Sequence, residues 1–307
     1  MILMGTGTSH GIPVIACHCS VCQSHDVKDK RLRCSAYIVQ QETDGSETHI
    51  VIDTGPEFRI QAIKYGIDTL NAVLLTHSHA DHLNGLDDLR IFSHTKSEGA
   101  SRCSTGAKYA ESPGTGLCVY SNEKALSDVR TRFDYIFKTT QIGGGKPKLD
   151  LEDCAQFSSG NPLEIGSVRI IPVPMKHGNL ETTGWLLSAP EDDGRMHSIA
   201  YLTDCNEIPD SSIELLMENG GIIDHVVIDG LREMPHSTHF SYLEAMACAA
   251  KIGGRHTWLT HICHNMNHRG ITKYCRQHVP DFPGLVRIVK DGGSVLPAYD
   301  GLILETR

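Results

Sequence analysis

Four residues that can bind metal fall within the six positions from His77 to His82, where the sequence is His-Ser-His-Ala-Asp-His. Neutral imidazoles and carboxylates suit zinc, manganese or ferrous iron. A single histidine is more often a core or surface residue than a ligand, but four such residues so close together favour a metal site. An extended backbone sends His77 and His79 to one side. Asp81 and His82 are then free to face a second ion, so the spacing predicts a site for two ions.

The surrounding sequence indicates how this cluster is positioned. An apolar segment at 72–75 predicts a buried strand, and residues 83–86 lead into a helix, which places the cluster on a strand-to-helix turn. Polar residues follow four other short apolar segments: Asp53 after 49–52, His177 after 168–173, Asp204 after 199–202 and His261 after 257–259. Because strand ends converge at one edge of an open sheet, we expect these side chains to share the site.

Helical segments lie between these strands. A helix is expected to have Pro56 in its first turn. Ser241 and Glu244 have capping-box spacing before an Ala-rich helix that should end near Gly253. Because strands and helices alternate and no linker divides the chain, we expect one α/β domain over residues 1–307.

Residues 93–116 interrupt this pattern just after the metal-motif helix. The segment is rich in Ser, Gly, Thr and Ala. Such a composition predicts either a substrate lid or a mobile insertion, and the sequence leaves both interpretations open.

The composition predicts a soluble protein of the cytoplasm. Of the 307 residues 40% are hydrophobic, and no apolar run approaches the roughly 18 to 20 residues needed to span a membrane. The first residues lack the features of a signal peptide. Eleven cysteines, an odd number without disulfide-framework spacing, favour reduced thiols. A net charge of −9 disfavours a nonspecific nucleic-acid coat but not a small phosphorylated substrate.

A second cluster places three thiols within six residues, at Cys17, Cys19 and Cys22. This spacing is typical of metal ligands, but it is one ligand short of a closed tetrahedral site. A fourth ligand must therefore come from elsewhere in the chain. A site of this kind would stabilise the protein without doing chemistry.

The order and spacing of these residues resemble the metallo-β-lactamase superfamily over nearly the whole chain. Its signature, His-x-His-x-Asp-His after a strand, is followed by a distant His, an Asp and a final His. The resemblance implies a four-layer αβ/βα sandwich with two metals at one edge. It implies these ligands: His77, His79 and His177 for one metal, Asp81, His82 and His261 for the other, and Asp204 as the bridging carboxylate. Because His79 stands where oxygen-reducing diiron members carry a carboxylate, the chain resembles the hydrolytic branch.

A narrower resemblance is to the PhnP family of cyclic phosphodiesterases. It is carried by the cysteine cluster and by residues 5–13, Gly-Thr-Gly-Thr-Ser-His-Gly-Ile-Pro. That family adds a structural zinc held by three cysteines and one histidine, which implies His264 as the fourth ligand. The resemblance also implies that His239 contacts the phosphate and assists departure of the leaving oxygen. Asp53 is expected to orient the histidine loop rather than to bind metal.

These features favour a metal-dependent phosphodiesterase. Two divalent ions, zinc or manganese with iron as an open alternative, can activate a water for attack on phosphorus. Asp204 would hold the pair together, Asp81 would orient the nucleophile, and His239 would assist the leaving group. The resemblance implies a small phosphodiester substrate, such as a cyclic ribose phosphate or a nucleotide.

Two other functions stay open. A transfer-RNA 3′-processing endonuclease uses nearly the same metal residues, but it should add a basic RNA-binding arm, and the acidic balance disfavours it. A sensor protein would retain the metals without turnover. We expect no membrane partner and no extended nucleic-acid partner, and a homodimer remains open. The substrate, the catalytic metals and the oligomeric state are not determined by the sequence.

Overall fold

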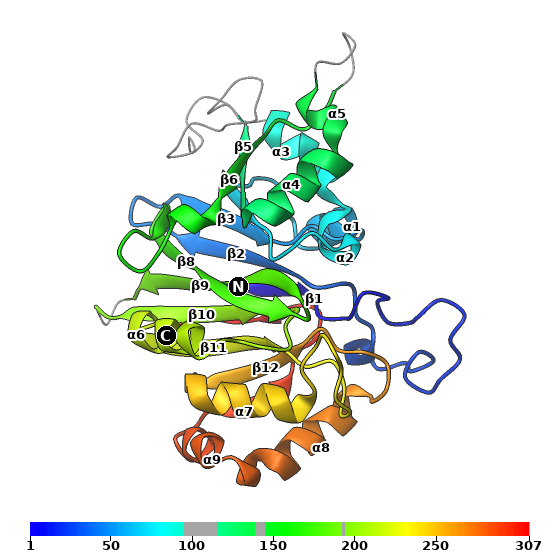
Figure 1. The fold of residues 1–307 in the computed structure, drawn as a ribbon. Coiled ribbons are helices and arrows are strands. Elements are labelled where there is room, and N and C mark those ends of the chain that lie inside the picture. The colour runs from blue at the N-terminus through cyan, green and yellow to red at the C-terminus, as the bar shows by residue number, and fades with distance from the viewer. Residues whose placement is uncertain (95–115, 139–144, 192–193, 307) are drawn as a thin grey trace.

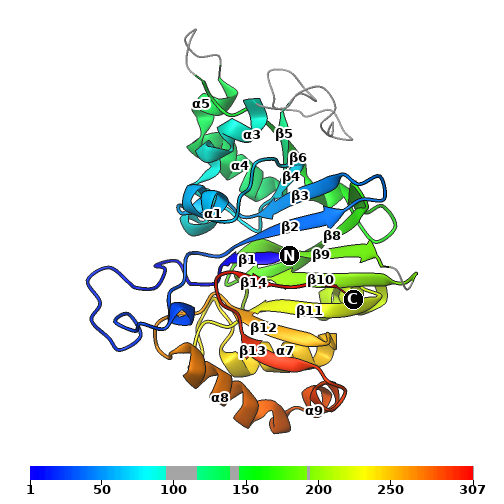
Figure 2. The ribbon, with the colours of Figure 1, turned by 180° about the vertical axis from the view of Figure 1, so that it is seen from behind.

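The structure is a computed structural model that describes residues 1–94, 116–138, 145–191 and 194–306. The described residues form two seven-stranded sheets that lie against each other, with helices on the outer face of each (Figures 1 and 2). The predicted four-layer αβ/βα sandwich is therefore confirmed. In Figure 1 most helices of one outer layer lie in the upper part, and most helices of the other lie in the lower part.

The first sheet has the strand order β14-β1-β2-β3-β4-β5-β6, and the second has the order β13-β12-β11-β10-β9-β8-β7. The strands of the first sheet are β1 (Ile2–Gly5), β2 (Ser35–Gln41), β3 (Glu47–Ile52), β4 (Ala72–Leu74), β5 (Leu117–Ser121), β6 (Leu149–Asp153) and β14 (Leu302–Ile303). Those of the second are β7 (Leu163–Ile165), β8 (Val168–His177), β9 (Leu180–Pro190), β10 (Met196–Leu202), β11 (Ile222–Asp229), β12 (His256–Thr260) and β13 (Ser294–Pro297).

Helices cover both outer faces. The α-helices of the described residues are α1 (Phe58–Lys64), α2 (Ala80–Leu83), α3 (Arg90–His94), α4 (Glu123–Arg132), α5 (Asp134–Phe137), α6 (Asp210–Asn219), α7 (Tyr242–Ile252), α8 (His268–His278) and α9 (Pro283–Lys290). The 3-10 helices are η1 (Val27–Asp29), η2 (Leu86–Leu89), η3 (Cys154–Gln156) and η4 (Val279–Asp281). The first five α-helices lie on the first sheet and the last four on the second (Figure 1).

Alternating side chains of the central strands bury both faces of each sheet. In β10, Ile199 and Tyr201 pack in the core between the two sheets. Ala200 and Leu202 point the other way, into the core beneath the helices of the second sheet. Successive side chains of a strand alternate between its faces, so a strand that is apolar at every position fits a sheet covered on both sides.

Parallel strand pairing sets the site edge. Strands β3 to β6 pair in parallel, as do β10 to β13. Neighbouring strands in each set therefore end at the same edge, and the polar residues that follow them are delivered together. This is the convergence that the strand-end pattern predicts.

The helix boundaries predicted from capping residues agree with the structure in one helix and differ in another. Ser241 caps α7 with a complete capping box to Glu244, and Gly253 ends this helix in a left-handed conformation with φ 83°. Pro56 differs from its prediction, because α1 begins at Phe58 behind Glu57 and the proline lies before the first turn.

The structure does not test the predicted insertion or the predicted single domain. Most of the predicted insertion at 93–116 lies outside the described residues, and the single domain over 1–307 stays a prediction. Within the described part of the chain, none of the helices is long and apolar enough to cross a membrane. The cytoplasmic location and the homodimer also stay predictions.

Candidate metal-dependent active site

The loop after β4 and the short helix α2, together called the ligand loop, carry the first four candidate ligands. His77 and His79 lie before the helix, and Asp81 and His82 lie within it. His79 is the N-cap of α2 and has an extended backbone, with φ −63° and ψ 152°. The loop packs tightly on the β3–α1 turn, because a Cβ placed on Gly55 would lie 2.2 Å from the carbonyl oxygen of Asp81. A side chain at Gly55 would therefore push the ligand loop away.

The first cluster contains His77, His79 and His177, whose ligand nitrogens all lie within 4.8 Å of one another. The ring centroid of His79 is 4.5 Å from that of His77 and 5.1 Å from that of His177. His77 and His177 are buried, whereas His79 is exposed. The cluster thus opens to solvent over His79.

The second cluster contains Asp81, His82, Asp204 and His261, again with all ligand atoms within 4.8 Å. Nε2 of His82 is 3.3 Å from Oδ2 of Asp81 and 3.0 Å from Oδ2 of Asp204. Nε2 of His261 is 3.2 Å from Oδ1 of Asp204. These four side chains point at one volume.

Asp204 links the two clusters. Its Oδ1 is 3.9 Å from Nε2 of His77 in the first cluster and 3.2 Å from Nε2 of His261 in the second. The residue is 2% exposed, and its Oδ2 also accepts a hydrogen bond from Oγ1 of Thr203 at 3.0 Å. A carboxylate in this place can serve two ions at once.

Asp53 supports the ligand loop from below. Its Oδ2 lies 2.7 Å from Nδ1 of His82 and accepts a hydrogen bond from Oγ1 of Thr76 at 2.8 Å. Its Oδ1 accepts the backbone N–H of Thr76, also at 2.8 Å. Asp53 therefore fixes the ring of His82 so that Nε2 faces the cluster.

His239 lies between the histidines of the two clusters. Its ring centroid is 4.5 Å from that of His177 and 4.5 Å from that of His261. Its Nδ1 lies 2.8 Å from Oδ2 of Asp229, the last residue of β11. Asp229 is fully buried, and the same oxygen accepts the backbone N–H of Cys205 at 3.2 Å. Because Nδ1 faces Asp229, Nε2 is the ring nitrogen of His239 that remains for other contacts at the site.

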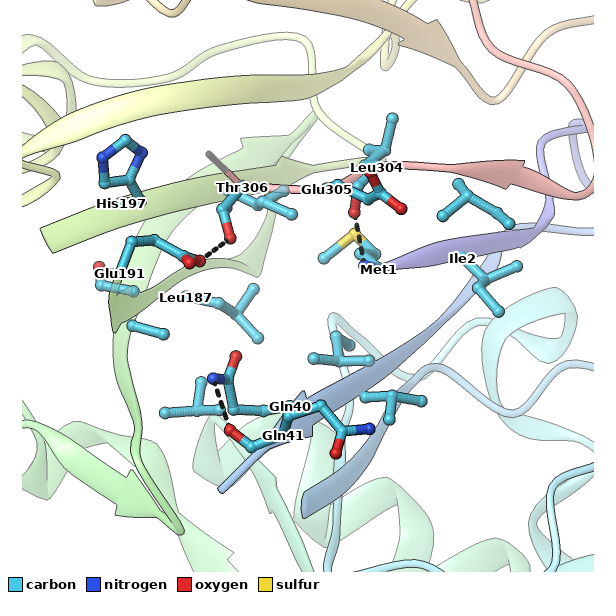
Figure 3. A pocket seen from close by; sticks show the side chains of 17 residues that line it. Met1, Ile2, Gln40, Gln41, Leu187, Glu191, His197, Leu304, Glu305 and Thr306 are labelled. Atoms are coloured by element: carbon cyan, nitrogen blue, oxygen red, sulfur yellow. Dashed lines mark hydrogen bonds between the residues drawn. The ribbon is translucent and has the colours of Figure 1, made fainter. Parts of the chain in front are cut away.

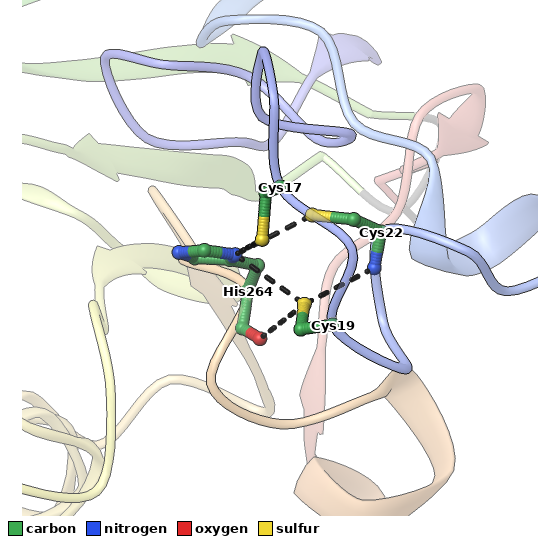
Figure 4. A group of neighbouring side chains, drawn as sticks. All are labelled: Cys17, Cys19, Cys22 and His264. Atoms are coloured by element: carbon green, nitrogen blue, oxygen red, sulfur yellow. Dashed lines mark hydrogen bonds between the residues drawn. The ribbon is translucent and has the colours of Figure 1, made fainter.

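A separate cluster joins Cys17, Cys19, Cys22 and His264, with all ligand atoms within 4.8 Å (Figure 4). The three sulfurs lie 3.3, 3.5 and 3.4 Å from Nδ1 of His264. This cluster ties the N-terminal loop to the segment after β12, and both views show that loop beside α8 (Figures 1 and 2). The predicted fourth ligand is thus brought to the three thiols.

A model of the beta-lactamase superfamily domain matches residues 48–262. The match covers more than half of the chain and contains both clusters of the sheet edge together with His239. The chain belongs to the metallo-β-lactamase superfamily. The thiol cluster lies outside the matched residues. The ligand clusters give this superfamily domain a site that is suited to metal-dependent hydrolysis.

Individual relatives of this metallo-β-lactamase-fold protein agree. The chain is 33% identical to a diphosphatase from the PhnP family, with a TM-score of 0.74 over 100% of this chain and 97% of that chain. Zinc-bound PqqB from Methylobacterium extorquens shares the fold at 16% identity, with a TM-score of 0.64 over 99% of both chains. An octanoyltransferase of Porphyromonas gingivalis is 32% identical over 302 residues, which are 97% of this chain and 53% of that protein. The chain spans about half the length of this curated relative.

The clusters of this superfamily member fit divalent cations. Nε2 of His77, His82 and His261 is buried, and no residue that the structure describes forms a hydrogen bond with any of the three. Buried polar atoms are normally paired, because leaving one unpaired costs about 1–3 kcal/mol. Metal ions would use the three nitrogens.

Electrostatics agree with this fit. Burial lowers the pKa of His77 well below its ordinary value, and the His82 charge adds to this. Burial opposes ionisation of Asp204, but the imidazoles of His261 and His82 hold its pKa well below the usual range. Burial likewise opposes protonation of His82, yet Asp204 and Asp81 raise its pKa. The first cluster thus favours neutral imidazoles, and the second attracts positive charge that a divalent cation can supply.

At the thiol cluster, a backbone N–H also favours the ligand form. The N–H of Cys22 donates to Sγ of Cys19 at 3.4 Å, and this bond is the main cause that lowers the pKa of Cys19 to about 6. Burial raises the pKa of Cys22 to about 11. The lowered pKa favours the thiolate form of Cys19, and thiolates are the form that binds zinc.

All the residues predicted for the site are brought together, but their roles as ligands and catalysts stay predictions. Sequence reasoning missed Asp229, although it follows the apolar segment 226–228 just as Asp53 and Asp204 follow theirs. It also missed Asp128 and Arg132 of α4, which contact Ser78 inside the ligand loop.

A cavity of about 490 Å³ lies away from these clusters (Figure 3). Its walls include Leu187, Ile199 and Leu304, and Glu191 and His197 also line it. None of the candidate metal ligands lines this cavity. It is therefore distinct from the candidate active site.

Proposed function

We propose that the protein is a metal-dependent phosphodiesterase that acts on a small phosphodiester. The observation that carries this proposal is the Asp229–His239 pair beside the two ligand clusters. Ligand clusters alone suit many hydrolases, whereas a buried acid–histidine pair aimed at the site supplies a proton donor for a leaving oxygen. Similarity to a PhnP-family diphosphatase extends the substrate class to diphosphate diesters.

Each residue of the site has its own role in the proposed reaction. Two divalent cations, when bound, supply Lewis acidity and an activated water for attack on phosphorus. The seven ligands would hold them, with Asp204 shared between the clusters and Asp81 orienting the nucleophile. His239 donates a proton from Nε2 to the departing oxygen, and Asp229 stabilises the protonated ring and fixes its direction.

For the cofactors, we propose two catalytic ions, zinc or manganese with iron as an alternative, and one structural zinc. The sheet-edge clusters offer imidazole and carboxylate ligands that suit all three metals. The cluster of Cys17, Cys19, Cys22 and His264 offers the ligand set of closed structural zinc sites. Elemental analysis of protein purified without chelator should give three metals per chain.

A panel of substrates tests the proposed reaction. It contains cyclic ribose phosphates, 2′,3′-cyclic nucleotides, linear dinucleotides, dinucleoside diphosphates, a lactam and an octanoyl thioester. We expect turnover of one or more phosphodiesters by the metal-replete protein. Preferred turnover of the lactam or the thioester would refute the phosphodiesterase, and metal binding without any turnover would favour a sensor.

The substrate should be small. The net charge of −9 opposes the counterion-release term that dominates binding to long nucleic acids. Excess folded transfer RNA should therefore compete weakly with the small substrate at physiological salt. Tight competition together with cleavage at the transfer-RNA 3′ end would favour the endonuclease instead.

A further inference from the structure

Two side chains of helix α4 form hydrogen bonds with the ligand loop. Asp128 accepts the hydroxyl hydrogen of Ser78, and Nη1 of Arg132 donates to the backbone carbonyl of the same residue. Ser78 stands between the candidate ligands His77 and His79. One face of α4 therefore meets the loop at the first cluster.

Arg132 keeps most of its hydrogen-bonding capacity for solvent. A guanidinium has five N–H donors, and within the described part of the chain Arg132 makes a single hydrogen bond. Arg132 is exposed, and so is the neighbouring ligand His79. Arg132 and His79 are thus both accessible to a molecule that approaches the ligand loop from solvent.

No carboxylate of the described residues forms an ion pair with Arg132. Other arginines near the loop are balanced: Arg33 pairs with Glu57, and Arg130 pairs with Glu123. Arg132 instead brings a positive charge to the backbone of Ser78, next to the candidate ligand His79. The guanidinium of Arg132 would repel two cations bound at the ligand clusters. An anion bound between Arg132 and the cations would be attracted by both.

We propose that Arg132 binds the second phosphate of a diphosphate-diester substrate while the phosphate under attack lies at the ligand clusters. A guanidinium fork matches phosphate oxygens in a bidentate manner, and such charge-assisted bonds are the strong ones. A substrate with one phosphate leaves the Arg132 fork unused. Arg132 therefore sets specificity for diphosphate over monophosphate linkages. This inference rests on the proposed phosphodiesterase function.

The test compares two diadenosine substrates, one joined through a single phosphate and the other through a diphosphate. Adenylyl-(3′,5′)-adenosine has one, and diadenosine 5′,5′-diphosphate has two. We expect Arg132→Gln to raise KM for the diphosphate about tenfold or more and to change KM for the monophosphate less than about twofold. Arg132→Lys, which keeps the charge but loses the fork, should fall between wild type and Arg132→Gln.

Two variants serve as controls. Lys124→Gln removes the same charge from an exposed position in the first turn of α4 and should leave both substrates unaffected. Asp128→Asn weakens the other contact to Ser78 and should alter both substrates alike. If Asp128→Asn reproduces the selective loss, or if Arg132→Gln affects both substrates equally, Arg132 only positions the loop and the inference is wrong.

Binding measurements keep this test separate from that of the proposed function. Titration calorimetry with ADP and AMP repeats the comparison without turnover. Arg132→Gln should weaken ADP about tenfold and AMP little. If Arg132→Gln leaves the ADP affinity unchanged, the role of Arg132 is wrong even if the wild-type protein cleaves phosphodiesters. If the wild-type protein shows no turnover but Arg132→Gln selectively weakens ADP binding, only the enzyme assignment is wrong.

Discussion

Asp229→Asn should slow the proposed reaction through His239. The carboxylate lies 2.8 Å from Nδ1 of His239 and is fully buried, so the asparagine keeps the shape but loses the charge. A hydrogen bond to a charged group contributes about 1.5–3 kcal/mol, and that amount in the transition state is a factor of about 10 to 150 in rate. We expect kcat to fall by this factor with KM nearly unchanged.

The leaving group decides whether the loss comes from proton donation. A dinucleotide releases an alkoxide that needs a proton, whereas a 4-nitrophenyl ester releases a stable phenolate. Asp229→Asn should therefore slow the dinucleotide by the full factor and the nitrophenyl ester only a few-fold. Equal losses on the two substrates would refute a role for the pair in protonating the leaving oxygen.

Asp224→Asn is the matched control. Asp224 lies on the same strand, is 3% exposed and meets Nδ1 of the buried His197 at 2.6 Å, away from the clusters. Both variants should lose stability, but only Asp229→Asn should lose rate. Metal content is the second check, because Asp229 also lies within ligand distance of Asp204 and His261. Loss of a catalytic metal in Asp229→Asn would make this residue a ligand.

Three further perturbations have defined outcomes. Cys17→Ser should remove one of the three metals and lower the melting temperature while the catalytic pair stays bound; loss of the catalytic metals alone would contradict separate sites. Asp204→Ala should cost more activity at saturating metal than His239→Ala, and wild-type turnover by the Asp204 variant would exclude it as a ligand. Burial, and next the charge of Arg31, lower the pKa of His268 to about 4. The unfolded state therefore binds a proton first, so this contribution to stability is complete above about pH 6.5 and is lost as pH falls toward 4. His268→Asn should reduce the loss of unfolding free energy at acid pH by on the order of 1 kcal/mol, since the ring is only half-buried. Denaturant titrations at several pH values measure this, and parallel stability profiles of the wild type and the variant would refute it.

Much of the site was predictable because many of its polar residues stand at the ends of strands that can be recognised in the sequence. Most of the candidate ligands at the sheet edge follow short apolar strands, and apolar runs of this length are recognisable without knowledge of tertiary structure. The same rule would have found Asp229, which follows Val226, Val227 and Ile228. The helix cap at Ser241 was predictable for a related reason, since a capping box is a local pattern.

The contribution of α4 could not be predicted from local patterns. Asp128 and Arg132 are four positions apart on the polar side of a helix, where such charges usually face solvent or pair with each other. Only the packing of α4 against the ligand loop turns them toward Ser78. Their roles depend on contacts over about fifty positions of sequence, which no periodicity encodes.

The backbone of the site was also beyond sequence reasoning. Asp53, Asp204 and His261 have φ values of 60°, 57° and 56°, and each follows within two residues of a central strand. A non-glycine residue in this conformation costs on the order of 1–3 kcal/mol and persists only where its surroundings enforce it. Here buried hydrogen bonds hold the turn, as between Asp53 and Thr76. Glycine would relieve the strain, but it has no side chain to support His82 or to bind metal. The same sharp turns that end the strands therefore aim these three side chains, and the core between the sheets offsets the strain that the site requires.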